Sequence, residues 1–428
     1  MRKKQRTKEA RFPLDFSDKR VYNWRYYEAV GGIAVMKKTD TVLVGIGGYG
    51  NGYVKEAFDG ASREFVNVVA AVEPFPDSAK NIGLIRERNI PVYCSLDEFL
   101  RHGKAELAVL CTPIAFHAEQ IIACMEHEMD VLCEKPLCAD EKDIDRIRTV
   151  RDKTGKHLLV GFQWSCNPAI LAAKRDIIAG IYGKPTELKT LVLFPRGDSY
   201  FHRSTGWAGK IYDAEGRAVY DSVANNAAAH YLHNLFFMMG DAPCNSRMPD
   251  DVYAELGRAN PIENFDTAVI SCKLNGAEAT FIASHATCEE VNPVFRFTFE
   301  RGVIFNVSPF PPENAAADAE PDEIIGILAD GSRRSYGKAL GGGDFSKLGI
   351  AARIAQGVPM DGCTLEGAEV HTRVISHIQR SFPIRNFQNL RREGDMNVVE
   401  GLYDLLINLY AHPRRGALEA FGKENSAK

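Results

Sequence analysis

The chain has 428 residues, of which 45% are hydrophobic and 25% charged, and its net charge is −4. This length suits two domains, and the nearly balanced charge argues against general electrostatic attraction to nucleic acid or to an acidic membrane surface. Ten cysteines are scattered without a C-x-x-C pair, and no run of about 18 apolar residues occurs, so we expect a cytoplasmic protein with reduced thiols and no membrane span.

Residues 1–38 are predicted to be a mobile extension. Six of the first eleven residues are basic, but charged residues follow where the apolar segment of a signal peptide would stand. The sequence MKKTDTVLVGIG, which begins at Met36, would also be a normal start for a nucleotide-binding domain. Translation from Met36 is therefore an alternative to a native extension.

A glycine-rich turn follows the first predicted strand, at residues 41–44. Gly45, Gly47 and Gly50 have the G-x-G-x-x-G spacing, with Gly48 and Tyr49 between them. In a dinucleotide site such glycines permit a tight turn, a close approach of the backbone to the pyrophosphate, and close packing of the next helix. The amino end of that helix would then face the phosphates.

Glu73 ends the second predicted strand, at residues 66–72, and lies 23 residues beyond Gly50. This is near the spacing of the carboxylate that binds the adenosine ribose. Since a carboxylate accepts hydrogen bonds from the 2′-hydroxyl and repels a 2′-phosphate, Glu73 favours NAD over NADP. The alternative is an exposed glutamate in a loop.

Strands and helices alternate through residues 39–160, which predicts a parallel, doubly wound sheet. Thr112 and Pro113 follow one predicted strand, Glu134, Lys135 and Pro136 follow another, and His117 opens a helix. Ligands of such sheets bind at the carboxyl ends of the strands. These residues are therefore expected to share one cofactor cleft with the glycine turn.

The order of GIGGYG, Glu73, TPIAFH and CEKP resembles the Gfo/Idh/MocA oxidoreductases, from Val42 onward. The resemblance implies an N-terminal Rossmann domain joined to an α+β domain with an open, mostly antiparallel sheet, here residues 161–428. The C-terminal helices could pack back on the first domain. The resemblance also implies bound NAD, a substrate between that sheet and the nicotinamide, and a homo-oligomer, either a dimer or a tetramer.

Lys135 is the first candidate for a catalytic role. It follows a strand beside the cofactor cleft, where the positive nicotinamide ring of NAD⁺ would disfavour an ammonium group, so Lys135 is suited to accept or relay a hydroxyl proton. The resemblance implies that Lys135 contacts the nicotinamide ribose and the substrate hydroxyl, that Glu134 contacts the nicotinamide end, and that the peptide bond before Pro136 can be cis. A solvated surface lysine is the alternative.

A second group is Asn226, His230 and His233, predicted to share one face of a helix because they are four and three residues apart. The family has aspartate, histidine and aspartate at these spacings, so only His230 is retained. We expect His230 to act as acid or base and Asn226 to orient a hydroxyl, while Asp221 could supply the missing charge. A metal site has no third ligand at a recognisable spacing, and we expect none; His233 reads equally well as a satisfied core histidine.

Aromatic, amide and basic residues in the second domain predict a carbohydrate site, because aromatic faces stack on sugars while amides and guanidinium groups bind hydroxyls. The candidates are Trp164, Tyr200, Arg203, Trp207, Asn225, Asn226 and His233, although either tryptophan could instead anchor the core. The sequence as a whole predicts an NAD-dependent oxidoreductase acting on a secondary hydroxyl of a sugar, glycoside or cyclitol. A glycosidase that oxidises its sugar transiently and recycles NAD, and a non-catalytic dinucleotide-binding regulator, are the alternatives.

Overall fold

The computed structural model describes residues 37–202, 206–309, 311–316, 318–339 and 345–426, and Lys38–Lys428 forms one compact unit. The predicted extension at residues 1–38 lies outside the described residues except for Lys37 and Lys38. Its mobility therefore remains a prediction. Among the described residues, no helix is both long and apolar enough to cross a bilayer.

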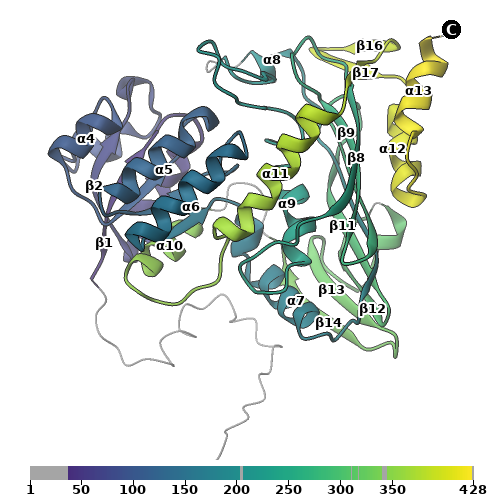
Figure 1. Ribbon diagram of the computed structural model, residues 1–428, viewed down its shortest axis with the longest axis horizontal. Coiled ribbons are helices and arrows are strands. Elements are labelled where there is room, and N and C mark those ends of the chain that lie inside the picture. Colours follow the sequence, from purple (N-terminus) through teal and green to yellow (C-terminus); the bar gives the residue numbers. More distant parts are fainter. Residues whose placement is uncertain (1–36, 203–205, 310, 317, 340–344, 427–428) are drawn as a thin grey trace, which may run out of the picture. The chain divides into compact units, whose positions relative to one another are not determined.

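The first domain contains a sheet of six parallel strands in the order β3-β2-β1-β4-β5-β6 (Figure 1). Its strands are β1 Thr39–Val44, β2 Val66–Val72, β3 Val92–Tyr93, β4 Leu107–Leu110, β5 Asp130–Cys133 and β6 Leu158–Val160. The central strands β1 and β4 are buried along nearly their whole length, because helices cover both faces of the sheet. The strand order reverses beside β1, which is where doubly wound sheets bind ligands.

One helix follows each of the first five strands. These helices are α2 Asn51–Phe58, α3 Ile82–Arg86, α4 Leu96–His102, α5 His117–Glu126 and α6 Lys142–Thr154. Ser95 caps α4 as its residue type predicts, because its hydroxyl accepts a hydrogen bond from the Glu98 N–H at 3.1 Å. The helices bury their apolar sides in two clusters, one on each face of the sheet.

The second domain contains a nine-stranded sheet in the order β14-β13-β12-β11-β7-β10-β9-β8-β15. Neighbours are antiparallel except for β7 with β10 and β8 with β15. Its strands are β7 Pro185–Leu193, β8 Asp250–Arg258, β9 Thr267–Leu274, β10 Ala277–Ser284, β11 Val291–Phe299, β12 Gly302–Asn306, β13 Glu323–Leu328, β14 Arg333–Lys338 and β15 Ile384–Asn386. A two-stranded hairpin consists of β16 Leu390–Glu393 and β17 Met396–Val399.

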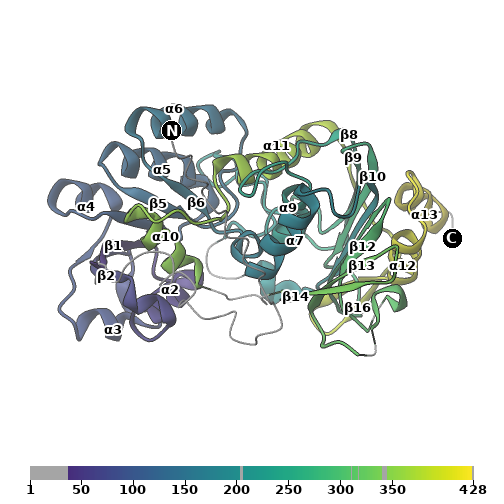
Figure 2. The ribbon, with the colours of Figure 1, turned by 90° about the horizontal axis from the view of Figure 1, so that it is seen from below.

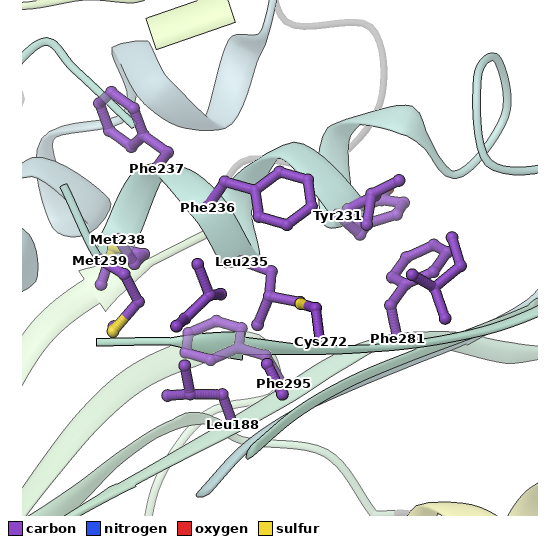
Figure 3. Packing of buried hydrophobic residues seen from close by; sticks show 14 of the residues in the cluster. Leu188, Tyr231, Leu235, Phe236, Phe237, Met238, Met239, Cys272, Phe281 and Phe295 are labelled. Carbon is purple, nitrogen blue, oxygen red and sulfur yellow. The ribbon is translucent and has the colours of Figure 1, made fainter. Parts of the chain in front are cut away.

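Helices cover both faces of this sheet, so neighbouring residues of one strand enter different cores. Phe281 of β10 packs with α7 Pro168–Ile178, α9 Ala229–Met238 and α11 Leu365–Ser381, and Figure 3 shows Leu235 of α9 between the helix and the sheet. Ile282, the next residue, packs on the other face with α12 Leu402–Ala411 and α13 Ala417–Ser426. This is the two-residue period of a strand with two buried faces.

Helix α10, Lys347–Ala355, returns from the second half of the sequence to the first sheet, where Figures 1 and 2 show it in green among the purple and blue elements. Leu348 and Ala351 are buried in one core cluster of the first domain. The Thr39 hydroxyl of β1 also donates a hydrogen bond to the Ala352 carbonyl at 2.8 Å. One helix from the C-terminal part of the chain therefore completes the first domain.

The predicted fold class, a doubly wound parallel sheet followed by an α+β domain with a mostly antiparallel sheet, is confirmed. One predicted helix was placed wrongly: α9 begins at Ala229, so Asn226 lies in the preceding turn and does not share a regular helical face with His230 and His233. Near the C-terminus, β17 ends at Val399, and α12 starts only after Gly401, at φ +76°.

Truncating Leu406 of α12 tests the burial of the outer sheet face. Leu406 is 0% exposed, whereas Leu390 of β16 is 43% exposed. We expect Leu406→Ala to lower the free energy of unfolding by about 2–5 kcal/mol, because it leaves a cavity in a packed core. Leu390→Ala is the matched control and should change it by no more than about 0.5 kcal/mol. Urea denaturation of both variants measures the difference, and equal effects would contradict the packing described.

Candidate active site

The glycine turn after β1 has the geometry of a dinucleotide cradle. Gly45 has φ +80°, a backbone conformation that side chains disfavour. A Cβ built on Gly50 would lie 1.8 Å from the Gly45 carbonyl oxygen, so α2 packs on the turn at a distance that only glycine permits. Gly48 and Tyr49 complete the turn, and Tyr49 is 45% exposed. The turn therefore fits a pyrophosphate at the amino end of the helix.

Glu73 stands at the end of β2, as predicted, and the protein itself orients its side chain. Its Oε2 atom accepts the Gly47 N–H at 2.9 Å and its Oε1 atom accepts the Phe75 N–H at 3.1 Å. Because the carboxylate is buried beside the second glycine, the alternative of an exposed loop glutamate is not what the structure shows. A ribose at this strand end would meet a carboxylate already held in place.

His117 joins the two strand-end turns of the TPIAFH and CEKP motifs. One ring nitrogen, Nδ1, lies 2.8 Å from the Pro136 carbonyl oxygen, and Nε2 lies 3.0 Å from the Thr112 carbonyl oxygen. Burial lowers the pKa of His117, although both carbonyl contacts oppose this shift. The Lys135–Pro136 peptide bond is cis, and Pro113 lies in the turn that His117 closes. The spacing of the two motifs thus reflects a direct contact between them.

A buried ion pair lies beneath the end of β5. The Glu134 Oε1 atom is 2.8 Å from Lys347 Nζ, and the two side chains are 8% and 1% exposed. The same oxygen accepts the Tyr53 hydroxyl at 2.6 Å, while Oε2 accepts the Lys135 N–H at 3.2 Å. Burial alone would raise the pKa of Glu134, but the Lys347 ammonium holds it below its usual value.

Lys347 is the residue that sequence reasoning missed. It is the first residue of α10 and also donates to the Gly161 carbonyl at 3.2 Å, so it joins the ends of β5 and β6. Burial opposes its charge, but the pKa of Lys347 is raised because Glu134 faces it. A lysine separated from its partner by most of the second domain carries no local spacing signal, so no motif could have found it.

Lys135 extends from the end of β5 to the turn before α9. Its Nζ donates to the backbone carbonyl of Asn226 at 2.8 Å and to the side-chain Oδ1 of Asn226 at 3.1 Å. The structure thus brings together two predicted catalytic residues, one from each domain. Both acceptors are neutral oxygens, in the position where the family has a carboxylate.

His230 follows on the first turn of α9 and is 9% exposed. Burial, and after it the nearby Lys135 charge, lowers the pKa of His230 well below its usual value. The imidazole is therefore neutral at neutral pH. Within the described residues, its Nδ1 atom has no hydrogen-bond partner, and the ring meets Phe162 edge-on at 5.9 Å between centroids. A neutral imidazole is able to accept a proton.

His233 points into the protein interior. It is 0% exposed, its ring stacks on Phe162 at 3.9 Å between centroids, and its Nε2 lies 2.7 Å from the Ser165 hydroxyl. Burial, followed by the neighbouring His371, lowers the pKa of His233 well below its usual value. The described residues contain no cluster of metal-ligand type around it. His233 is therefore a core histidine, but only Nε2 is hydrogen-bonded, since its Nδ1 has no hydrogen-bond partner within the described residues. Its predicted contact with substrate remains a prediction.

The other predicted substrate residues are dispersed. Trp164 is 5% exposed and meets Tyr231 edge-on in the core, and the Asn225 side-chain amide donates to the Tyr220 carbonyl at 3.0 Å. Trp207 is half-buried against a small apolar cluster that includes Ile114 and Val219, and Arg203 lies outside the described residues. Asp221 is buried, and its Oδ2 accepts the Gly209 N–H at 2.5 Å; that it supplies charge to the site remains a prediction.

Tyr200 lies beside Asn226, and His285 lies beside Tyr200. Tyr200 belongs to the short helix α8, Asp198–Phe201, and its hydroxyl is 3.5 Å from the Asn226 side-chain nitrogen. Its ring lies 5.6 Å from that of His285, whose Nδ1 contacts the Phe194 carbonyl at 2.7 Å. Because β7 and β10 are parallel neighbours, the segments that follow them begin at the same edge of the sheet. The sequence signal for Tyr200 was the group of aromatic residues in the loop after β7.

Comparison with known proteins agrees with this geometry. Residues 39–162 match the Gfo/Idh/MocA family model, described as an oxidoreductase family with an NAD-binding Rossmann fold. The chain is 25% identical to a 2,7-anhydro-N-acetylneuraminate hydratase of Mediterraneibacter gnavus over 226 residues, which are 52% of this chain and 55% of that protein. It is 36% identical to an inositol 2-dehydrogenase of Mycolicibacterium smegmatis over 92 residues, which are 21% of this chain and 27% of that protein. These alignments thus span little more than half of the curated relatives, or less.

The WlbA dehydrogenase from Bordetella pertussis, solved in complex with NADH and UDP-GlcNAcA, has a similar fold, with a TM-score of 0.63 and 20% identity. The similarity covers 81% of this chain and 96% of that structure, so it includes both domains. The resemblance to the Gfo/Idh/MocA oxidoreductases that the motifs predict is therefore confirmed.

Removing the Lys347 charge tests the buried ion pair. In Lys347→Met, Glu134 would remain buried without its main partner, so we expect its pKa to rise and the free energy of unfolding at pH 7 to fall by about 3–5 kcal/mol. In the native protein the pKa of Glu134 is lowered, so its contribution is present above the usual glutamate value and disappears in acid. The defect of the variant should therefore be largest at high pH and should shrink towards pH 4.

Denaturation of both proteins between pH 4 and pH 8 measures this difference. The double variant Lys347→Met/Glu134→Gln should recover much of the loss, because no buried charge remains. Lys142, whose side chain is 74% exposed, provides the control Lys142→Met, which should have almost no effect. A pH-independent defect in the single variant would contradict the argument.

Proposed function

We propose that this chain is an NAD-dependent oxidoreductase that transfers hydride between the nicotinamide and a secondary hydroxyl of a sugar, glycoside or cyclitol. The observation that carries the proposal is the pairing of Lys135, at the cofactor edge of the first sheet, with Asn226, in the turn before α9. This contact joins the dinucleotide cradle to the second domain at one point. The similarity to an inositol 2-dehydrogenase supports a polyhydroxylated substrate.

The residues present fit the dinucleotide. The glycine turn would hold the pyrophosphate, Glu73 the adenosine ribose, and Glu134 with Lys135 the nicotinamide end. When bound, the dinucleotide would supply the hydride acceptor or donor. Glu73 at the ribose position favours NAD, since its buried carboxylate would repel a 2′-phosphate.

Lys135 and His230 would control the hydroxyl proton. In oxidation, the C–H pair of electrons leaves the carbinol carbon with the hydride, and the O–H proton must pass to a protein group. His230 is neutral and is able to accept it, while the Lys135 amine donates hydrogen bonds that orient Asn226 and a substrate oxygen. In the reverse direction the same groups return the proton to the forming alkoxide.

Replacing Lys135 tests this assignment. We expect Lys135→Met to lower kcat by about 10²–10⁴-fold, because proton transfer and hydroxyl positioning are lost together. NADH affinity should change by less than about threefold, since the glycine turn and Glu73 remain. Steady-state kinetics with the best substrate, together with NADH fluorescence titration, separate the two effects. Lys142→Met is the control, and undiminished turnover in Lys135→Met would remove this residue from the mechanism.

The substrate class is accessible by incubation with NAD⁺ and a panel of sugars, glycosides and cyclitols. NADH absorbance and product identity are followed in the same samples. Accumulation of NADH with a ketone product is the result expected for the proposed dehydrogenase. Binding of NADH without turnover of any substrate would instead favour a dinucleotide-binding regulator.

A second candidate is a reaction that regenerates NAD⁺ within each cycle, such as glycoside cleavage through transient oxidation. Two observations favour keeping it: a neutral Asn226 stands where the family has an acid, and one relative is named a hydratase, an enzyme that adds water without net oxidation. Release of the aglycone, or addition of water, without net NADH would favour this candidate over the dehydrogenase.

A further inference from the structure

The start of α10 lies directly against the glycine turn. The Phe345 ring is 4.8 Å from the Tyr49 ring and 4.9 Å from the Tyr53 ring, measured between centroids. A Cβ built on Gly52 would lie 1.9 Å from the Phe345 Cζ atom. The ring therefore occupies the space that a side chain at position 52 would need, and Phe345 explains why the turn is followed by a further glycine.

Lys347, two residues later, reaches the other end of the cradle. It pairs with Glu134 at the end of β5 and lies 5.5 Å from the Tyr49 ring centroid. Residues 345–347 thus contact both the turn after β1 and the strand end that holds Lys135. They add to the one hydrogen bond already described between these parts, from the Tyr53 hydroxyl of α2 to Glu134.

We propose that Phe345 and Lys347 form a cofactor clasp, which holds the glycine turn and Glu134 in one rigid arrangement and thereby sets the affinity and dissociation rate of the dinucleotide. This inference rests on the proposed function, because it assigns the same cradle to NAD. The clasp touches the pyrophosphate and nicotinamide parts of the cradle. Glu73, the residue proposed for the adenosine ribose, is held instead by hydrogen bonds from the Gly47 and Phe75 N–H groups.

The separation of the two parts gives a specific test. NADH spans the whole cradle, whereas AMP has the adenosine and only one of the two phosphates, so it has no group at the nicotinamide end beside Glu134. In Phe345→Ala we expect the Kd for NADH to rise about tenfold, mostly through faster dissociation, because the aromatic packing of Tyr49 is lost. The Kd for AMP should stay within twofold of the native value, a result that general unfolding of the domain would not give.

Phe65→Ala is the matched control. Phe65 is also a half-buried phenylalanine that packs on α10, but it does so later in the helix than Lys347. A Cβ built on Gly349 would lie 3.2 Å from the Phe65 ring, and this ring lies 5.2 Å from the Arg353 guanidinium carbon. We expect this variant to bind NADH within twofold of the native protein. NADH fluorescence titration gives the affinity, displacement of NADH by excess NAD⁺ in a stopped-flow instrument gives the dissociation rate, and calorimetry gives the AMP affinity.

Three results would overturn the clasp: unchanged NADH affinity and dissociation rate in Phe345→Ala, an AMP affinity that falls in step with that of NADH, or an equal loss in Phe65→Ala. Each of these leaves the native protein able to bind NADH, so the proposed function would survive. Failure of the native protein to bind NADH would remove both the clasp and the proposed function.

Discussion

The pairing of Glu134 with Lys347 is the constraint on which the candidate site depends. Either charge alone would be costly to bury, and together they are stable only because each has further partners, the Tyr53 hydroxyl for Glu134 and the Gly161 carbonyl for Lys347. This pair attaches α10 to the first sheet at the end of β5, next to Lys135. A helix that follows most of the second domain in the sequence therefore helps to position the catalytic candidate. The first domain is consequently not an independent segment of sequence, although its sheet is.

Neutral groups, in contrast to this ion pair, lie on the α9 side of Lys135. The groups that meet Lys135 across the domain boundary are the neutral oxygens of Asn226, and the histidines of α9 are kept neutral by burial. A site with a carboxylate at position 226 would stabilise a protonated His230, whereas this one favours the imidazole base. Burial and the Lys135 charge thus keep His230 in its neutral form and lower its affinity for a proton.

Local patterns predicted the first domain well because its elements repeat at short range. The β-branched runs, the glycine spacing and Ser95 each act within a few residues, and the structure has β2 and α5 at the predicted residues. The substrate side was less predictable, because Trp164 and Asn225 are chemically suited both to a sugar and to a core, and only tertiary packing decides between them. The Asn226 error has a similar origin: alanine-rich spacing favours a helix, but the bonds of residues 222–228 form turns that delay it.

The motif residues of the first domain bind one another in the same places where a dinucleotide would contact them. Glu73 is held by Gly47, the two strand-end turns are held together by His117, and Glu134 is held by Tyr53 and Lys347. Groups that are already oriented lose little conformational entropy when a ligand arrives, so such contacts raise affinity for the cofactor whatever the substrate is. The motif spacing therefore reflects contacts within the protein. It carries no information about Tyr200, Asn226 and His285, which lie together in the structure but come from three separate segments and share no spacing.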